Sequence, residues 1–489
     1  MTEREKVAHL YRRLGFGATT EEIARGEREG AKATASRLID FDGVDDGFPI
    51  SPWSFCFDEG KDEIYLDSFR PAVYWSLRMV MSQRPLQEKL ALFWHDHFAV
   101  SGSKVEAGPM MLHYLEILRN LGSGNFRDLL LEISQSPAMC FWLDTHENLK
   151  DAPNENFARE VMELFTVQIG NYTERDVQEA ARAFTGWGVR YLVFEKGGEN
   201  VQEVARDCIL RGRPMFTFAY SPELHDTGIK TVLGKRGNLT GEDVIDFLAG
   251  HPKTQTAICK KLWEFFVYEN PAESIISELV NVFQSSNGNI RKILWAIVQH
   301  PEFWSERAIR TKIKSPVDFS VSILRQLRLN SFLIEAHGKT PKPFVAAPKA
   351  LRDIGGAAFG LSTQQGLSPL FPPNVAGWDW GTAWITPNNM MYRNQVGQLI
   401  VGTADDNYVG SGVIALRLTE LGADKSPQGV VDGLLTLFDA KLPDEKRAVL
   451  IEGCRKHGGH MALTEPQPRA NMLGIVLRGL FASPEFQFC

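Results

Sequence analysis

Residues 151–187 read DAPNENFAREVMELFTVQIGNYTERDVQEAARAFTGW, a pattern that predicts two short helices. A proline followed by Asn154 marks the start of the first helix, because proline has no amide proton to donate and asparagine can cap free amides. Gly170 is a natural stop for that helix. Thr173 and Asp176 form a capping-box pair that starts the second helix.

The first of these helices carries an unusual density of charge. Glu155, Arg159 and Glu163 recur at every fourth position and therefore share one face, with Glu160 in the adjacent row. One interpretation is a surface ladder of ion pairs, each contributing about 0.2–0.5 kcal/mol. The other is a partly buried cluster in which a glutamate acts as metal ligand or acid/base and Arg159 tunes it. Arg182 repeats the acid–base pairing on the second helix, which favours the buried cluster.

Composition describes an ordinary globular protein. The chain has 489 residues, 44% hydrophobic and 23% charged, with a net charge of -7 and a pI near 5.9, which argues against nucleic-acid binding. The six cysteines form no Cys-x-x-Cys pair, which fits a reducing compartment. The N-terminus lacks a signal core, and no apolar run reaches the roughly 20 residues of a membrane span. We expect a cytoplasmic protein without a membrane span, although a trimmed export signal would leave the same sequence.

Helical spacing of apolar residues predicts helices over most of the remaining chain. The expected helices include residues 66–82, 86–98, 110–121 and 126–135 and much of 240–329. Alternating residues within 215–220 and 230–234 predict strands. The other expected segments are an acidic loop at 41–65, a β-hairpin insertion around 190–235, a Pro/Trp-rich loop at 369–387 and a connector at 405–428.

Two histidine-containing segments add candidate functional groups. His95 and His97 end a predicted helix, where residues two apart point about 200° away from each other, so both reach one metal only if the helix unwinds. Each could equally be a core histidine. In the turn between the predicted strands, His225 beside Asp226 could form an oriented base and Lys230 could hold an anion. A surface turn would need none of these roles.

The Pro/Trp-rich loop also admits two interpretations. Indoles on a loop can line a pocket for sugar rings or other flat ligands. They can equally cover the core as a lid.

Long motifs spread over the chain resemble one known family. They are Trp94-His95-x-His97-Phe98, Ala152-Pro-Asn-Glu-Asn-Phe-Ala-Arg-Glu160 with Glu163-Leu164, Gly170-Asn-Tyr-Thr-Glu174 with Asp176, Ala183-Phe-Thr-Gly-Trp187, His225-Asp226-x-Gly228-x-Lys230, Lys314-Ser-Pro316 and Pro372-Pro-Asn-Val-x-Gly-Trp378. Together they resemble the bacterial family called domain of unknown function 1800 (DUF1800), over nearly the whole chain. The sequence departs at Gln168, where the family usually has glycine, which affects only a helix end.

The family has no established activity, so the resemblance implies little about chemistry. It implies that residues 1–489 form one functional unit. Members are often encoded beside a second uncharacterised family that looks like a secreted, phosphatase-type protein, which implies a protein partner from an adjacent gene. The missing export signal bears against a role outside the cytoplasm.

We therefore expect a mainly α, large multi-helix globular protein with a small β-hairpin insertion. The leading hypothesis is a metal-dependent hydrolase, in which a divalent metal held by His95, His97 and Glu160 activates a water. The predicted catalytic residues are His97, Glu155, Arg159, Glu160, Glu163, Arg182, His225, Asp226 and Lys230. The predicted substrate-binding residues are Asn154, Asn156, Trp187, Trp378 and Trp384.

Two other hypotheses stay open. Without a metal, the carboxylates could act as a general acid/base pair on a glycan. Alternatively, the chain is a non-catalytic partner or assembly protein whose polar cluster holds helices in register. The enzyme hypotheses require that positions near 95, 160 and 225 meet in one cavity.

Overall fold

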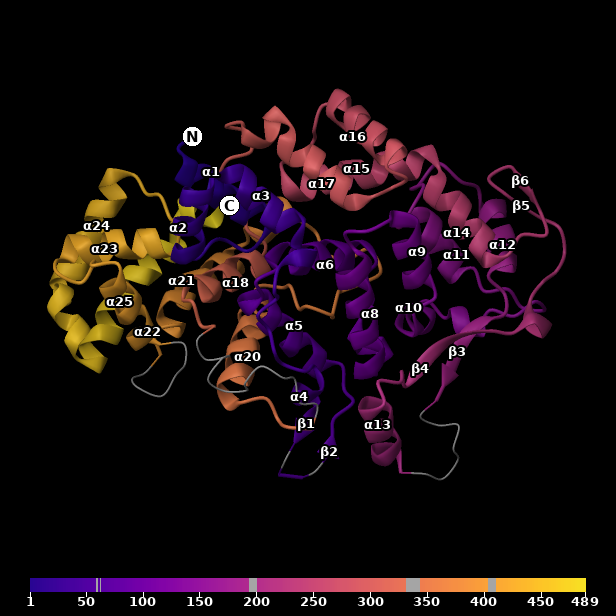
Figure 1. The fold of residues 1–489 in the computed structure, drawn as a ribbon, viewed down its shortest axis with the longest axis horizontal. Helices are drawn as coiled ribbons and strands as arrows, with labels where there is room; N and C mark the ends of the chain where they lie inside the picture. The colour runs from indigo at the N-terminus through magenta and orange to yellow at the C-terminus, as the bar shows by residue number, and fades with distance from the viewer. Residues whose placement is uncertain (59, 62, 193–199, 331–343, 403–409) are drawn as a thin grey trace.

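A computed structural model describes residues 1–58, 60–61, 63–192, 200–330, 344–402 and 410–489. The described residues are mainly α-helical with three small two-stranded antiparallel sheets, which confirms the predicted fold class. One buried hydrophobic cluster extends from Val7 to Phe486 and draws on helices from all parts of the chain. Figure 1 shows the C-terminal helices at one end of an elongated molecule and the larger hairpins at the other.

The N-terminal third supplies the central helices, and α6 lies near the middle of the molecule (Figure 1). The elements here are α1 (Glu3–Leu14), α2 (Thr20–Glu29), α3 (Ala31–Ile39), η1 (Phe41–Gly43), α4 (Trp53–Cys56), β1 (Phe57–Asp58), β2 (Glu63–Ile64), α5 (Phe69–Met81), α6 (Pro85–His97), α7 (Gly102–Val105), α8 (Gly108–Leu121), α9 (Phe126–Ser134), α10 (Pro137–Trp142) and η2 (Thr145–Glu147). The predicted acidic loop at 41–65 thus contains a short helix and the β1–β2 hairpin. Propensity missed both because each is only a few residues long.

The middle third carries the polar helices and most of the β structure. Its elements are α11 (Asn156–Glu163), α12 (Glu174–Ala183), β3 (Trp187–Tyr191), α13 (Val201–Leu210), β4 (Phe216–Tyr220), η3 (Pro222–Leu224), β5 (Lys230–Val232), β6 (Lys235–Gly237), α14 (Gly241–Gly250), α15 (Pro252–Phe266), α16 (Glu273–Ser285), α17 (Ile290–Gln299) and η4 (Pro301–Trp304). The predicted capping box of Thr173 and Asp176 is present. The first helix ends at Glu163 rather than near Gly170. Asn154 accepts from the amide of Asn156, the first residue of the helix (2.9 Å), so the predicted capping side chain is present.

The predicted β insertion contains two hairpins instead of one. The strand at residues 216–220 pairs with β3, in the register Trp187 opposite Tyr220, and β5 pairs with the following strand β6. Both predicted strands therefore exist, but they do not pair with each other. The local alternation that identified them carries no information on the partner strand.

The C-terminal third returns to the N-terminal helices. Its elements are α18 (Pro316–Gln326), α20 (Lys349–Thr363), η5 (Gly381–Trp384), α21 (Pro387–Leu399), α22 (Ser411–Glu420), α23 (Pro427–Leu437), α24 (Asp444–Lys456), η6 (Gly459–Thr464), α25 (Pro466–Ala482) and η7 (Pro484–Gln487). The predicted connector at 405–428 therefore includes a complete helix, α22, while residues 403–409 lie outside the described residues. The amide of Cys489 donates to the carbonyl of Lys312 (2.8 Å), which joins the last residue to the segment before α18.

A buried ion network holds the central helices α5, α6 and α8 together. The Glu88 carboxylate accepts hydrogen bonds from Trp75 Nε1 (3.1 Å), Arg78 Nε (3.0 Å) and Arg119 Nε (3.0 Å). All four residues are buried. The carboxylate is therefore the common partner of two guanidinium groups that have little access to water.

We expect Glu88→Leu to lower the free energy of unfolding by about 3–5 kcal/mol, because it leaves two buried arginines without their shared carboxylate. Urea unfolding followed by circular dichroism measures the change. Glu116→Ala is the matched control, since this partly exposed carboxylate also pairs with Arg119, and it should cost about 1 kcal/mol or less. Equal effects of the two substitutions would contradict the central role of Glu88.

Candidate functional site

The last turn of α6 places three consecutive polar residues against three different parts of the chain. His95 is fully buried between Tyr114 and the Pro/Trp-rich loop. The Tyr114 hydroxyl donates to the carbonyl of Phe98 (2.8 Å), so its oxygen accepts a hydrogen bond from His95 Nδ1 (2.9 Å). On the other side of the ring, the Leu370 amide donates to His95 Nε2 (3.0 Å). Burial lowers the pKa of His95 to about 3. This histidine is neutral, and both ring nitrogens are engaged.

His97 points to the opposite side of the helix and is equally constrained. Its Nε2 donates to the carbonyl of Phe165 (3.1 Å), and its Nδ1 accepts from the Lys261 ammonium (3.0 Å). Lys261 also donates to the carbonyl of Leu164 (3.4 Å). Burial, reinforced by the Lys261 charge, holds the pKa of His97 well below its usual value. Burial also lowers the pKa of Lys261.

Asp96, between the two histidines, is tied to the Pro/Trp-rich loop. Its Oδ1 accepts from the amide of Trp378 (2.8 Å) and its Oδ2 from Trp380 Nε1 (2.7 Å). Burial raises the pKa of Asp96 to about 6, against the effect of these two hydrogen bonds. Gly377 is required here, because its φ is +80° and a Cβ atom would collide with the carboxylate of Asp96.

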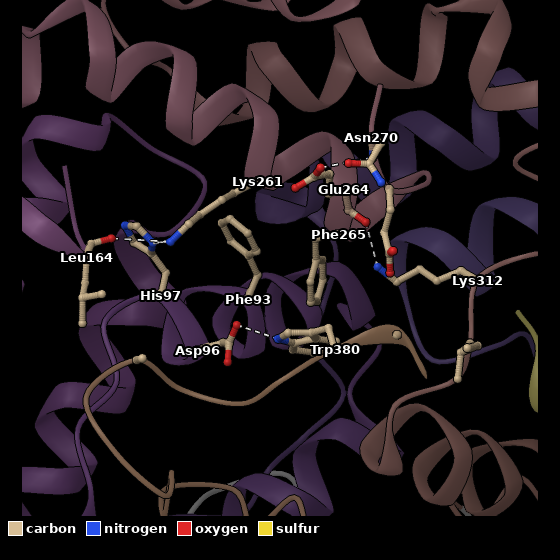
Figure 2. A pocket seen from close by; sticks show the side chains of 14 residues that line it. Phe93, Asp96, His97, Leu164, Lys261, Glu264, Phe265, Asn270, Lys312 and Trp380 are labelled. Carbon is tan, nitrogen blue, oxygen red and sulfur yellow. Dashed lines mark hydrogen bonds between the residues drawn. The ribbon is translucent and has the colours of Figure 1, made fainter. Parts of the chain in front are cut away.

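These groups face a cavity of about 360 Å³ between α6 and α15. Figure 2 shows Lys261 reaching toward His97 at one side, with the rings of Phe93 and Phe265 beside it. The remaining walls come from the Pro/Trp-rich loop, through Trp380, and from residues 312–313. The site thus combines aromatic walls with a carboxylate, an imidazole and amines.

Lys312 occupies the side of the cavity away from His97 (Figure 2). Its Nζ donates to the carbonyl of Glu264 (2.9 Å) and lies 5.0 Å from the centroid of the Phe265 ring and 5.9 Å from that of Trp380. Burial lowers the pKa of Lys312 to about 8.

The glutamates predicted as catalytic lie on α11 or, for Glu155, at its N-cap, and all are outside the cavity lining. Glu155 pairs with Arg159 (3.1 Å), which also binds Glu174 through two hydrogen bonds (2.8 and 2.7 Å), a partly exposed network like the predicted surface ladder. Glu163 accepts from the Tyr172 hydroxyl (2.6 Å). Glu160 is half-buried, and burial followed by the neighbouring Glu163 charge raises its pKa. The helix touches the cavity only through Leu164, just beyond its end.

The predicted groups near residue 225 form a second, separate cluster. Arg182 binds both oxygens of Asp226 (2.7 and 3.2 Å) and also Glu179 (3.1 Å). His225 Nδ1 donates to the carbonyl of Thr185 (3.0 Å). The buried Lys230 ammonium donates to the backbone carbonyls of Asp226 and Gly228. Because these bonds all close on neighbouring protein groups, the cluster attaches the turn and the β5–β6 hairpin to α12.

The predicted substrate-binding residues also have protein partners. Asn154 accepts from the amide of Asn156 (2.9 Å), whose side chain donates to Asp144 (3.4 Å). Trp187 is buried against Phe184 and Phe218, Trp378 packs on His95 with ring centroids 5.3 Å apart, and Trp384 is buried. All three indoles pack into the core, and for Trp378 and Trp384, which belong to the Pro/Trp-rich loop, this arrangement fits the lid interpretation. The neighbouring Trp380 is the indole that lines the cavity.

The predicted metal ligands His95, His97 and Glu160 are not gathered. Within the ranges that the structure describes, no group of three or more His, Cys, Asp or Glu side chains is placed to hold a metal ion. The physical reason at the histidines is that all four ring nitrogens already have partners. The metal hypothesis therefore gains no support from the described residues.

Sequence reasoning missed Asp96, Lys261, Lys312 and Trp380 as site residues. Asp96 lies between the two histidines that the sequence pattern marked as candidates. Lys261 shares the face of Ile258, Leu262 and Phe265 at helical spacing, and a lysine on an apolar stripe was the signal that could have revealed it. Lys312 carried no such signal.

The chain belongs to the family described as protein of unknown function (DUF1800), whose model matches residues 9–488. No curated protein and no solved structure matches the chain. Among the described residues, none of the helices has the length and apolar character to cross a membrane.

The raised pKa of Asp96 predicts a pH-dependent effect of Asp96→Asn. The carboxyl pKa is about 6 in the folded protein and about 3.9 in the unfolded chain. The folded state therefore favours the protonated carboxyl, and this contribution to the free energy of unfolding is fully present below about pH 4. It is lost as the pH rises through about 6, and the asparagine variant does not titrate. Relative to the variant, wild type should therefore lose up to about 3 kcal/mol between pH 4 and pH 7. Urea unfolding of both proteins at several pH values measures this, and a constant difference would contradict it.

The cluster around Asp226 predicts a local effect. In Asp226→Ala, amide hydrogen exchange in residues 226–233 should accelerate by about tenfold or more, because a hydrogen-bonded charge pair contributes on the order of 1.5–3 kcal/mol. Hydrogen-exchange mass spectrometry measures the change, with Asp151→Ala, an exposed aspartate nearby, as control. Faster exchange at α6 as well would contradict the separation of the two clusters.

Proposed function

We propose that this family member is an enzyme that transfers protons to and from a small organic substrate in the cavity between α6 and α15. The observation that carries the proposal is the convergence of Asp96, His97 and Lys261 on one cavity whose walls include the rings of Phe93, Phe265 and Trp380. In each of these groups, burial disfavours the charged form. Shifted pKa values of this kind are typical of groups that exchange protons in catalysis.

Asp96 is the proposed general acid/base. Each carboxylate oxygen accepts one hydrogen bond from the Pro/Trp-rich loop, which fixes its orientation and leaves further lone pairs for a ligand. Its pKa of about 6 lies close to neutral pH, where a carboxyl group can both accept and return a proton.

Lys261 is the proposed electrostatic stabiliser. One of its three N–H groups points to His97 and one to Leu164, so the third remains for a substrate oxygen on which negative charge develops. His97 acts as a positioning residue: its donor is committed to the Phe165 carbonyl, so its other nitrogen must accept from Lys261.

This proposal keeps the metal-free acid/base chemistry of the sequence hypothesis and transfers it from α11 to Asp96. A glycan remains one candidate substrate, with Trp380 rather than Trp378 or Trp384 at the cavity wall. Hydrolysis remains one candidate reaction. A metal-activated water would need a group of ligands that the described residues do not gather.

A second candidate, a non-catalytic partner or assembly protein, is favoured by one observation. The polar groups of Glu155, Arg159, Arg182 and Asp226 are all satisfied by neighbouring protein groups that hold α11, α12 and the hairpin together. If the family motifs only hold these elements together, substitutions in the cavity should leave the protein's activity in the cell unaltered.

The test is a screen of small aromatic esters, amides and carbonyl compounds with wild type, Asp96→Asn and Lys261→Met. We expect turnover by wild type to fall by about 10²–10⁴-fold in Asp96→Asn, the usual contribution of a general acid/base. The pH profile of the wild type should show a limb near pH 6 that the variant lacks.

Lys253→Met is the control, because this exposed lysine lies on the same helix as Lys261 and outside the cavity lining. Its activity should match wild type. Turnover that survives intact in Asp96→Asn would remove the acid/base role. An absence of turnover across the panel, with all variants folded, would favour the assembly protein.

A further inference from the structure

Lys312 is a half-buried cation without a carboxylate partner. Its only hydrogen bond within the described part of the chain goes to a backbone carbonyl, that of Glu264, and no Asp or Glu oxygen there lies within 4.0 Å of its Nζ. An ammonium removed from water needs a counter-charge or several acceptors to offset its desolvation. The amine therefore has unused donors at the cavity surface.

Charges of both signs surround Lys312 in the protein interior: the cations Arg13 and Lys89, and the negative groups Cys489 and Asp318. Arg13 is fully buried and donates to the carbonyl of Ala308 and to the Cys489 sulfur (3.9 Å). Lys89 forms a buried ion pair with Asp318. Burial and the charges of Arg13 and Lys89 lower the pKa of Lys312, whereas the negative groups Cys489 and Asp318 act in the opposite direction.

The carboxylates at the cavity are directed elsewhere. Glu264 accepts from the amide of Asn270 (3.1 Å), and Glu269 lies against Gly381 in an exposed position. Asp96 is bound by the two tryptophans of the loop. Among the described residues none of these carboxylates forms a salt bridge with Lys312, whose ammonium faces the rings of Phe265 and Trp380.

We propose that Lys312 binds the carboxylate of an organic acid whose apolar body lies between the rings of Phe93, Phe265 and Trp380. The substrate class of the cavity is then a carboxylic acid with a flat or apolar body. With its carboxylate at Lys312, the ligand extends across the cavity toward Lys261 and Asp96 (Figure 2). The inference rests on the proposed function in one respect, because that function assigns the chemistry at this second end of the ligand to Asp96 and Lys261.

The aromatic walls favour an organic acid over an inorganic anion. Phe93, Phe265 and Trp380 offer ring faces and edges that a small hydrated ion cannot use, whereas a flat apolar body gains contact area there. The Lys312 amine supplies the charge, and the aromatic rings supply contact area and orientation.

The experiment compares 4-fluorophenylacetate with the uncharged 4-fluorophenylacetamide, followed by fluorine NMR of the ligand. Wild type should bind the acid about tenfold more tightly than the amide, the order expected for one charged hydrogen bond. Lys312→Met should reduce this preference to about twofold or less, and Lys312→Arg should retain part of it. Lys253→Met should leave it unchanged.

Several results would overturn the assignment. They are equal affinity of wild type for acid and amide, binding of neither, a preference that survives in Lys312→Met, and loss of the preference in Lys261→Met instead. Displacement of the acid by millimolar chloride or phosphate would show a general anion site and also overturn it. Should Lys312→Met not fold, judged by circular dichroism, Lys312→Gln provides the same comparison with a polar side chain.

The same ligands separate this inference from the proposed function. Asp96→Asn should keep the preference for the acid, because Asp96 lies at the other side of the cavity. If Asp96→Asn leaves turnover intact while Lys312→Met abolishes the preference, the binding inference stands and the proton-transfer proposal fails. If instead Asp96→Asn abolishes turnover while Lys312→Met keeps the preference for the acid, the proton-transfer proposal stands and the assignment of Lys312 as a carboxylate-binding residue fails.

Discussion

The desolvated carboxylate of Asp96 is the constraint on which the site depends. Its two oxygens accept from the backbone of Trp378 and the indole of Trp380, so one side chain fixes both the position and the orientation of the Pro/Trp-rich loop. His95 fixes the same loop eight residues earlier, through the amide of Leu370. Position 377 of this loop must be glycine, because the loop backbone comes so close to Asp96 that a Cβ atom there would occupy the space of the carboxylate.

The cavity is a consequence of the same arrangement. His97, one residue after Asp96, holds Lys261 of α15 on the other side of α6, while the end of α11 supplies carbonyls to both residues. Lys312 reaches the cavity because the last residues of the chain pair with its backbone. Segments from five distant parts of the sequence thus enclose one volume, and burial then displaces the pKa values of the groups inside it.

The polar residues of α11 and α12 have a different role in this structure. Their charges are matched within the two helices and the adjoining hairpin, and most of the pairs retain access to water. Such pairs contribute modestly to stability but define how the hairpin sits on α12. The dense motif that identified the family therefore describes a framework next to the cavity, and the end of that framework positions His97 and Lys261.

Much of the architecture was predictable from local sequence. Helices α5, α6, α8 and α9 agree with the apolar spacing to within three residues, and the predicted capping box at Thr173 is present. Local hydrogen bonding and side-chain periodicity act over a few residues, so these features are written in short stretches of sequence. The short hairpin at 57–64 and the helix α22 were missed, since brief elements are decided by tertiary packing.

The identity of the site was decided by the tertiary structure. The sequence showed that His95, His97, Glu160 and Asp226 were polar residues in distinctive motifs, but it could not show which of them share a cavity. Lys261 and Lys312 lie outside the quoted motifs, and only long-range packing brings them to Asp96 and His97. The physical reason is that burial and pairing set the chemistry of an ionisable group, and both depend on residues far away in the chain.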